Sequence, residues 1–419
     1  MPPNRSHTPG QGENDSESTP PPEQDHPAID IVEVKLARRS GRGIRRLVTL
    51  CGTPTQLVAE YDRRLLESEP DGDGGNDGNS GDDDGDVDGD EHLTAENKEE
   101  IKRRRNREYQ SYLELIKLIP SLKERIADPR EELRIIYYAQ LVDGANNARS
   151  DDLSRVKSGV ASLLNNRTNG APNPPLDLDT RDGRGLQNDV TGRLLCPVIY
   201  DWDDPITRAK LRDGLDEHDA FDDYWIRCLY EGEKGDPEDV ERGFLRGNLL
   251  IKTFQMIFTS PSSARGNLDA EETSEAQGRR RKAPSKRPSV AAQLRMNGQV
   301  TAHAIAYAAV QCLLPKLHFS LNDATHWMSD YNSFNYEEFY EFIIDFFEED
   351  QTPEGKAAAD ELFNWWNQYV SGFSPTCVST VCGHSRRLVQ ISEAVVTRTP
   401  ATTAQSTPPK FLATDTNVE

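Results

Sequence analysis

The stretch EEIKRRRNREYQSYLELIKLIPSLKERI, residues 99–126, decides between two folds for this chain. A basic run at 102–107 leads into an apolar stripe at helical spacing, as in transcription factors that grip DNA with a basic helix. A basic zipper needs apolar positions sustained over several heptads, whereas Pro120 stops this helix about three turns after Tyr109. Because more apolar helices follow at once, we interpret the stretch as the first helix of an intramolecular bundle.

Helix start signals predict further helices around this one. Ser121 and Glu124 have the spacing of a capping box, and Asp128-Pro129 is typical of a helix start. A fourth helix is predicted from one apolar face, formed by Leu153, Val156, Val160, Leu163 and Leu164. Upstream, residues 29–34 (IDIVEV) predict a strand, and Thr53-Pro54 predicts a short helix. The region from about residue 95 therefore indicates a small bundle.

The second half of the chain has clearer helical patterns. Asp204-Pro205 predicts a short helix, and residues 235–264 predict a capped helix followed by a nearly all-apolar, buried one. Residues 300–314 (VTAHAIAYAAVQCLL) are apolar but too short to span a bilayer. Two amphipathic helices follow at 335–350 and 355–370, and the side chains expected inside are Tyr336, Phe339, Tyr340, Ile343, Ile344, Phe347, Leu362, Phe363, Trp366 and Val370. The predicted fold class is all-α, with an irregular multi-helix core.

Composition limits how much of the 419-residue chain packs into that core. Hydrophobic residues are 35% and charged residues 29%, a balance typical of chains that mix folded and disordered parts. The expected organisation is a disordered segment at 1–94, a helical bundle at 95–170, a main helical core at 171–264 and 291–371, a basic disordered insertion at 265–290, and a disordered tail at 372–419.

An acidic segment at 71–91 contains ten carboxylates and neither Lys nor Arg, within a chain of net charge −22. This acidity argues against non-specific nucleic-acid binding. Asp84, Asp86, Asp88 and Gly89 have EF-hand spacing, but position twelve of that loop is Ala95 in place of the bidentate Glu. We therefore interpret the segment as a solvated acidic linker.

The cysteines, at positions 51, 196, 228, 312, 377 and 382, are too scattered for a disulfide framework. The N-terminus has no apolar signal core. We expect a soluble, intracellular protein without a membrane partner and with reduced thiols. Cys377, Cys382 and His384 fall short of the four ligands of a structural zinc site, so ordinary thiols are favoured.

Motifs for catalysis or cofactor binding are missing. The sequence has no Walker A loop, no GxGxxG after a strand, no HExxH and no GxSxG. We predict no catalytic, cofactor-binding or metal residues and no cofactor, which favours a non-enzymatic role and leaves an enzyme as the alternative. The acidic residues and one histidine that would form a magnesium site are Asp201, Asp203, Asp204, Asp216, Glu217, His218, Asp219, Asp222 and Asp223, and we interpret most of them as helix caps and surface residues.

Three further groups have both a structural and a functional interpretation. The five tryptophans, at 202, 225, 327, 365 and 366, are interpreted as core anchors. His303 lies in an apolar helix, where a hydrogen-bonded core imidazole is favoured over a catalytic base. The basic clusters at 102–107 and 279–287 suit phosphate groups or a nuclear import receptor, and a solvated charge run is the alternative.

Six phrases occur together in one order: YLELIKLIPSLKERI, ARSDDLSRVKSGVASLL, TGRLLCP with DWDDP, RGNLLIKTFQMIFTSPSSA, VTAHAIAYAAVQCLL and ELFNWWNQ. In these, residues 105–370 resemble a family of uncharacterised proteins abundant in mushroom-forming basidiomycete fungi. The resemblance implies a shared helical domain of unknown function. Its members look like dispersed multicopy genes, which suggests a link to mobile elements.

The sequence therefore leads to two hypotheses. The first is a non-enzymatic helical interaction module with a protein partner, directed to the nucleus. The alternative is a mobile-element-associated nucleic-acid-binding protein or a divergent metal-dependent nuclease that uses the cluster around Asp201–Asp223.

Overall fold

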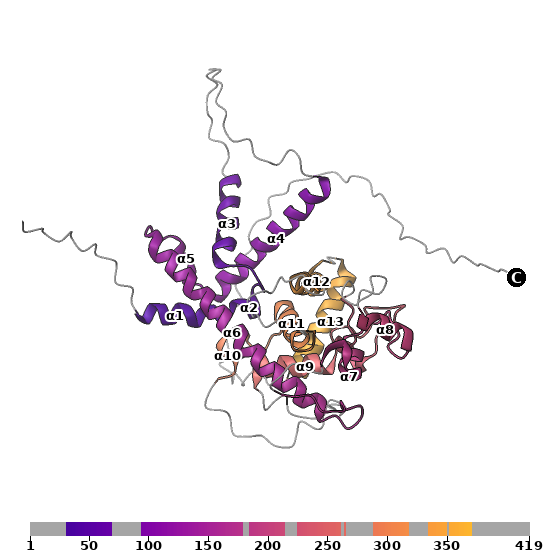
Figure 1. Cartoon of the computed structure of the whole chain (residues 1–419). Coiled ribbons are helices and arrows are strands. Elements are labelled where there is room, and N and C mark those ends of the chain that lie inside the picture. Colours follow the sequence, from indigo (N-terminus) through magenta and orange to yellow (C-terminus); the bar gives the residue numbers. More distant parts are fainter. Residues whose placement is uncertain are drawn as a thin grey trace, which may run out of the picture. The chain divides into compact units, whose positions relative to one another are not determined.

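Helices account for the regular secondary structure in the described part of the computed structural model (Figure 1). The structure describes residues 31–68, 94–178, 184–213, 224–260, 264, 288–317, 334–349 and 352–370. These residues all belong to one unit, which extends to Pro375. Within these ranges the chain forms isolated β-bridges but no strand, so the predicted all-α class is confirmed.

The helices of the first half are α1 (Ile31–Gly41), α2 (Ile44–Leu47), α3 (Pro54–Ser68), α4 (Ala95–Leu118), α5 (Leu122–Ile126) and α6 (Glu131–Asn165). Those of the second half are α7 (Asp189–Leu195), α8 (Pro205–Asp213), α9 (Asn248–Phe254), α10 (Val290–Gln293), α11 (Ala302–Leu317), α12 (Tyr336–Glu348) and α13 (Pro353–Tyr369). Three 3₁₀ turns, at 185–187, 227–229 and 231–233, connect them, and a π-helical turn at 255–259 continues α9.

The first hydrophobic cluster, here called the N-terminal core, joins α1–α5 to the first half of α6. Its buried side chains are Ala37, Ile44, Val48, Leu57, Val58, Tyr112, Leu115, Ile119, Leu122, Tyr137, Leu141 and Ala145. Tyr112 also stacks on Tyr61 of α3, with ring centroids 4.3 Å apart. α4 ends at Leu118, just before Pro120, and buries its apolar stripe within the same chain. The predicted intramolecular packing of this helix is therefore confirmed.

The second cluster, the main core, surrounds α11. The second half of α6, together with α9 and α12, packs against this helix, whose residues 304–310 are fully buried (Figure 1). The expected stripe of α12 is buried throughout, as are Leu362, Trp366 and Val370 of α13, whereas Phe363 is half-buried. A small satellite cluster of Cys196, Trp202 and Leu211 lies beside α7 and α8. The side-chain pattern of the second half was thus predicted closely.

α6 is one continuous helix of 35 residues, where the sequence predicted two. It begins at Glu131, three residues after the predicted cap Asp128, and continues through Gly144. At about 50 Å long, it contributes Leu141 to the N-terminal core and Val156 to the main core. The chain between these two positions contains no proline, and packing against α1 holds the glycine in helical geometry, so nothing breaks the helix.

The crossing of α1 and α6 depends on glycines. A Cβ atom on Gly144 would lie 2.0 Å from the carbonyl oxygen of Arg38, and one on Gly41 would lie 2.1 Å from that of Leu141. Any side chain at either position would therefore collide with backbone. The two helices approach so closely only because both positions are glycine.

Three local predictions are wrong. Residues from Ile31 onward form α1 and not a strand, because Ala37 and Gly41 give the segment a small-residue face that packs on α6. Ser121 makes no side-chain cap; instead Thr53 and Gln56 exchange the two hydrogen bonds of a capping box at the start of α3. Residues 235–247 form turns, and Asp236 caps the backbone N–H of Glu238.

The expected domain boundaries can be compared with the structure only in part, and one of them differs. α1, α2 and α3 occupy residues 31–68, inside the segment 1–94 that was expected to be disordered. The expectations for 1–30, 69–93, 265–287 and 371–419 lie outside the described residues. Among described helices, none has the length and apolar character needed to cross a membrane.

Candidate functional site

A buried arginine–carboxylate network lies between the two cores. Arg46 of α2 donates two hydrogen bonds to Asp152 of α6, from Nε to Oδ2 and from Nη2 to Oδ1, each 2.8 Å long. The two side chains are only 3% and 0% exposed. Tyr307 of α11 donates a third hydrogen bond to Oδ2, over 3.0 Å. A buried carboxylate is costly unless it is paired and hydrogen-bonded, and both conditions are met here.

A second buried arginine lies beside the first. Arg45 donates to the carbonyl oxygen of Gly52 over 2.7 Å and, more weakly, to Oδ1 of Asn146 over 3.4 Å. The Arg45 Nε has no hydrogen-bond partner among the described residues, and burial lowers the pKa of this guanidinium. Burial and then the charge of Arg45 lower the pKa of Arg149 to about 10. Guanidinium groups keep their charge even so, and the site is therefore strongly positive around Asp152.

The neighbouring titratable groups are held in their neutral forms. Burial and then the Glu337 carboxylate raise the pKa of the Cys51 thiol to about 12. His303 Nδ1 is hydrogen-bonded to the Tyr340 hydroxyl, 2.8 Å away, and burial lowers the pKa of this imidazole to about 4. The pKa values of Tyr307 and Tyr340 are raised well above the ordinary value by burial. None of these groups is a thiolate or a base poised near neutral pH.

The residues considered as an alternative magnesium site act as caps and surface partners where the structure describes them. Asp204 accepts from the backbone N–H groups of Ile206 and Thr207, over 3.2 and 3.0 Å, and so caps α8. Asp201 accepts from the N–H of Asp203, and Asp203 pairs with Arg193. Asp204 is therefore a helix cap, whereas Asp201 accepts a hydrogen bond within a turn and Asp203 is a surface residue. Asp216, Glu217, His218, Asp219, Asp222 and Asp223 lie outside the described residues. Within the described ranges, no group of three or more His, Cys, Asp or Glu side chains is arranged to hold a metal ion.

The structure also places the other candidates. Trp202 and Trp366 are buried, and Trp225 packs edge-on against Phe244 and Phe342, so these three are core anchors as predicted. His303 is a hydrogen-bonded imidazole, also as predicted. The four cysteines at 51, 196, 228 and 312, the described ones, are free thiols. Trp327, Cys377, Cys382, His384, the EF-hand-like residues and the basic cluster 279–287 lie outside the described residues.

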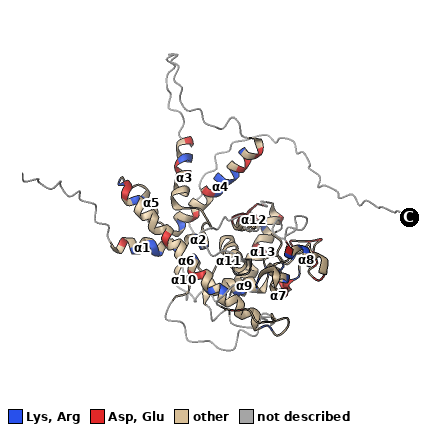
Figure 2. Cartoon of the chain, viewed as in Figure 1, with Lys and Arg blue, Asp and Glu red and all other residues tan. Residues whose placement is uncertain are grey.

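The basic run at 102–107 divides into two parts. Arg107 forms ion pairs with Glu341 and Asp345 on the acidic face of α12. Arg103, Arg104 and Arg105 are exposed, in a part of α4 where charges of both signs alternate (Figure 2). The end of the run that continues into the apolar stripe is therefore structural, and its beginning remains available at the surface.

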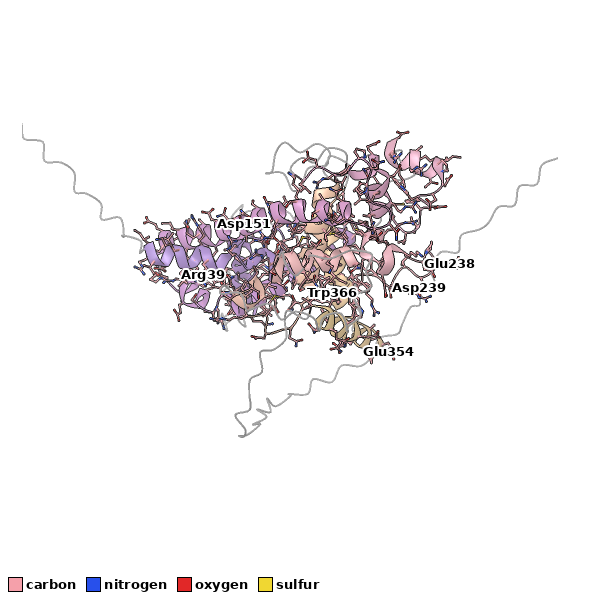
Figure 3. All side chains as sticks on the ribbon, turned by 90° about the horizontal axis from the view of Figure 1, so that it is seen from below. Arg39, Asp151, Glu238, Asp239, Glu354 and Trp366 are labelled. Carbon is pink, nitrogen blue, oxygen red and sulfur yellow. The ribbon has the colours of Figure 1, made fainter. Side chains whose placement is uncertain are left out.

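An open hollow of about 510 Å³ lies along the outer face of α13. Its lining residues are Ala357, Asp360, Glu361, Asn364, Trp365 and Gln368. Arg246 spans its edge, with the guanidinium carbon 5.4 Å from the Trp365 ring centroid and a 3.2 Å ion pair to Glu361. In Figure 3, Trp366 lies among the packed helices while Glu354 marks the exposed start of α13. The helix thus buries Trp366 completely, whereas Trp365, also predicted to be a core anchor, is half-buried: it packs against the main core and lines the hollow.

Sequence reasoning missed the centre of the buried network: Arg45, Arg46, Asp152 and Tyr307. One signal was present, because Asp152 falls on the same face of its helix as Leu141, Ala145, Ala148 and Val156. A carboxylate on an apolar stripe predicts a buried cation nearby. The position of that cation, about a hundred residues earlier, could not be read from the sequence.

The described residues thus define an all-α protein with a buried arginine–carboxylate network and a hollow along α13. Residues 143–371, more than half of the chain, match the family of unknown function DUF6698, and the chain belongs to this family. The matched region contains Asp152, Tyr307 and α13, whereas Arg46 precedes it. No curated protein and no solved structure matches the chain.

Proposed function

We propose that this protein is a non-enzymatic helical interaction module whose docking surface is the α13 hollow. The observation that supports it is Trp365, which borders an open hollow of about 510 Å³ although its neighbour Trp366 anchors the core. Tryptophan is enriched among the few residues that contribute most of the binding free energy at protein interfaces. The buried network supports the same proposal, since its histidine, thiol and tyrosines are neutral and poorly placed for acid–base or nucleophilic work.

The chemistry of the lining suggests the kind of partner. Asp360 and Glu361 contribute negative charge, Asn364 and Gln368 contribute amide groups, and Trp365 contributes an apolar face. This combination suits a protein segment that carries a basic side chain beside an apolar one. Arg246 already occupies the same kind of position over Trp365, which shows how a guanidinium fits there.

The test compares the partners captured by the full-length protein with those captured by two α13 variants, one at the half-buried Trp365 and one at the exposed Glu354. Trp365→Ala should lose a partner that the wild type retains, with affinity at least about tenfold lower, because truncating an interface tryptophan commonly costs 2 kcal/mol or more. Glu354→Ala, at the exposed start of the same helix, should retain that partner. Equal capture by all three proteins would reject α13 as the docking surface.

Three finer proposals accompany this one. Nuclear localisation is expected to depend on the basic cluster 279–287, and neutralising Arg279, Arg280, Arg281 and Lys282 should abolish it. The predicted relation to proteins of mushroom-forming fungi is the second proposal, and such a fungus is the host for the localisation experiment. We likewise propose the division into a bundle, a main core and unstructured segments. The N-terminal unstructured segment is shortened, because α1–α3 lie within the range first expected for it.

The nucleic-acid alternative has one supporting observation, the exposed Arg103, Arg104 and Arg105 on α4. Binding through these residues would weaken steeply as the salt concentration rises, because it would release counterions from phosphate groups. The same capture experiment in low and moderate salt separates this alternative from docking at Trp365.

A further inference from the structure

Several arginines that precede residue 143 contact acceptors inside the matched region 143–371. The pairs are Arg38–Asp143 at 3.1 Å, Arg42–Asp151 at 2.7 Å and Arg46–Asp152 at 2.8 Å, with Arg45 donating to Asn146 at 3.4 Å and Arg107 pairing with Glu341 and Asp345. Each donor lies before residue 143 and each acceptor lies within 143–371. Carboxylates of α6 and α12 in the matched region are therefore paired with arginines from the preceding part of the chain.

The pairs differ greatly in depth. Arg38–Asp143 and Arg42–Asp151 have about half of their side-chain surface exposed, and such pairs contribute little to affinity or stability. Arg39 and Asp151, labelled in Figure 3, are likewise exposed on α1 and α6. Only Arg46 reaches a fully buried carboxylate, where its planar fork matches both oxygens. Arg46 is therefore the anchor of this contact. The outer pairs set the position of α1 along α6.

The same segment fits the family region through its backbone and apolar side chains. Gly41 and Gly144 allow α1 to approach α6 at backbone contact. Leu50, three residues after α2, is 1% exposed and belongs to the main core. Helices α1 and α2 and the residues that follow them thus bring a small-residue face, two buried arginines (Arg45 and Arg46) and an apolar anchor to one site, which α6 and α11 form.

We propose that region 143–371 contains a receptor site for an arginine-bearing helix, centred on Asp152 and Tyr307, and that residues 31–53 occupy it as an intramolecular ligand. Arginine is specified over lysine because two parallel N–H donors meet the two carboxylate oxygens. The site lies apart from the α13 hollow, so this proposal does not rest on the proposed function. It also means that a second arginine-bearing helix binds this face only after α1–α2 has left.

The test converts the intramolecular ligand into a separate one. A protease recognition sequence is inserted between Ser80 and Gly81, in the Asp/Gly-rich segment 71–91, and the purified full-length chain is cut there. A labelled peptide that spans residues 29–68 is then added, and its uptake is measured as it replaces the cut fragment. All substitutions are placed in the peptide, so that the receptor keeps its native sequence and its folding is not in question.

The wild-type peptide should replace the fragment. The Arg46→Ala peptide should compete at least about 100-fold less well, because it leaves the buried Asp152 without its partner. The Arg46→Lys peptide should fall between them, and the Arg42→Ala peptide should match the wild type within about threefold.

Two outcomes would overturn the proposal. One is equal competition by the wild-type and Arg46→Ala peptides, which would make α1–α2 an apolar strap without an arginine receptor. The other is no uptake of the wild-type peptide even at millimolar concentration, which would make the segment an inseparable part of the core. Uptake into a dimer, with the cut fragment retained, would instead assign the site to a second copy and would also reject occupation in cis.

Discussion

At the scale of single residues, Asp152 concentrates the polar interactions of the protein's interior. It is completely buried, yet Arg46, Tyr307 and, at 3.6 Å, Arg155 surround its carboxylate with donors. An ion pair at this depth adds little net stability compared with a well-packed apolar pair, whereas removing one partner leaves an uncompensated charge. The network therefore determines which helices pack together, and it adds little to the free energy of unfolding.

Replacing Asp152 tests this account. Asp152→Ala should lower the free energy of unfolding by about 3–5 kcal/mol, because Arg46 would remain buried without a counter-charge. The measurement is a urea titration followed by circular dichroism. The matched control is Asp151→Ala, whose pair with Arg42 is exposed and which should change stability by less than about 1 kcal/mol. Similar losses in the two variants would contradict the account.

His303 predicts a dependence of stability on pH. Its pKa in the folded protein is about 4, below the ordinary value of 6.5, because burial disfavours the imidazolium. The unfolded chain therefore binds more protons than the folded one between these values. The stabilisation is complete above pH 6.5 and is lost as the pH falls towards 4.

The experiment compares the wild type with His303→Gln, which keeps a hydrogen-bonding group beside Tyr340. The wild type should lose about 1–2 kcal/mol more than the variant between pH 7 and pH 4.5, after allowance for solvent screening. Denaturant titrations across this range measure the difference, and other groups that titrate there cancel in the comparison. Parallel curves for the two proteins would show that His303 is not desolvated.

At the scale of elements, α6 connects the N-terminal core with the main core. Its first half lies in the N-terminal core, its second half in the main core, and Asp152 lies between them. The sequence showed a helix start signal for the first half and an apolar face for the second half, but it did not show the connection through Gly144. A glycine inside a helix lowers the helix propensity of that segment. Here Gly144 is the position at which α1 contacts α6.

Gly144→Ala tests that contact. The new Cβ would meet the Arg38 carbonyl oxygen, and separating α1 from α6 should cost about 1–3 kcal/mol despite the better helix propensity of alanine. Gly159→Ala, in the same helix, provides the control because its Cβ would meet the flexible side chain of Met256. Thermal unfolding should show a clear drop in Tm for the first variant and a smaller change for the second. A reversed order would place the close approach elsewhere.

At the scale of the whole molecule, the chain combines a region shared with its family and a preceding segment that covers it. The family match begins at residue 143, inside α6, so the shared region starts in the middle of a helix. The first helices of the chain then supply Arg46 and Leu50 to the interior of that region. The start of the matched region is therefore not a boundary between packed units here.

The sequence by itself determined the all-α class, the amphipathic stripes of α4, α12 and α13, the caps at Asp204, and the core roles of Trp202, Trp225, Trp366 and His303. These features are local, since periodicity of 3.6 residues and capping chemistry are written within a few turns of chain. Only the tertiary structure decided that residues 31–41 are helical, that α6 is continuous, and that Arg46 neutralises Asp152. Each of these depends on groups about a hundred residues apart, and a contact at that separation leaves no periodic trace in the sequence.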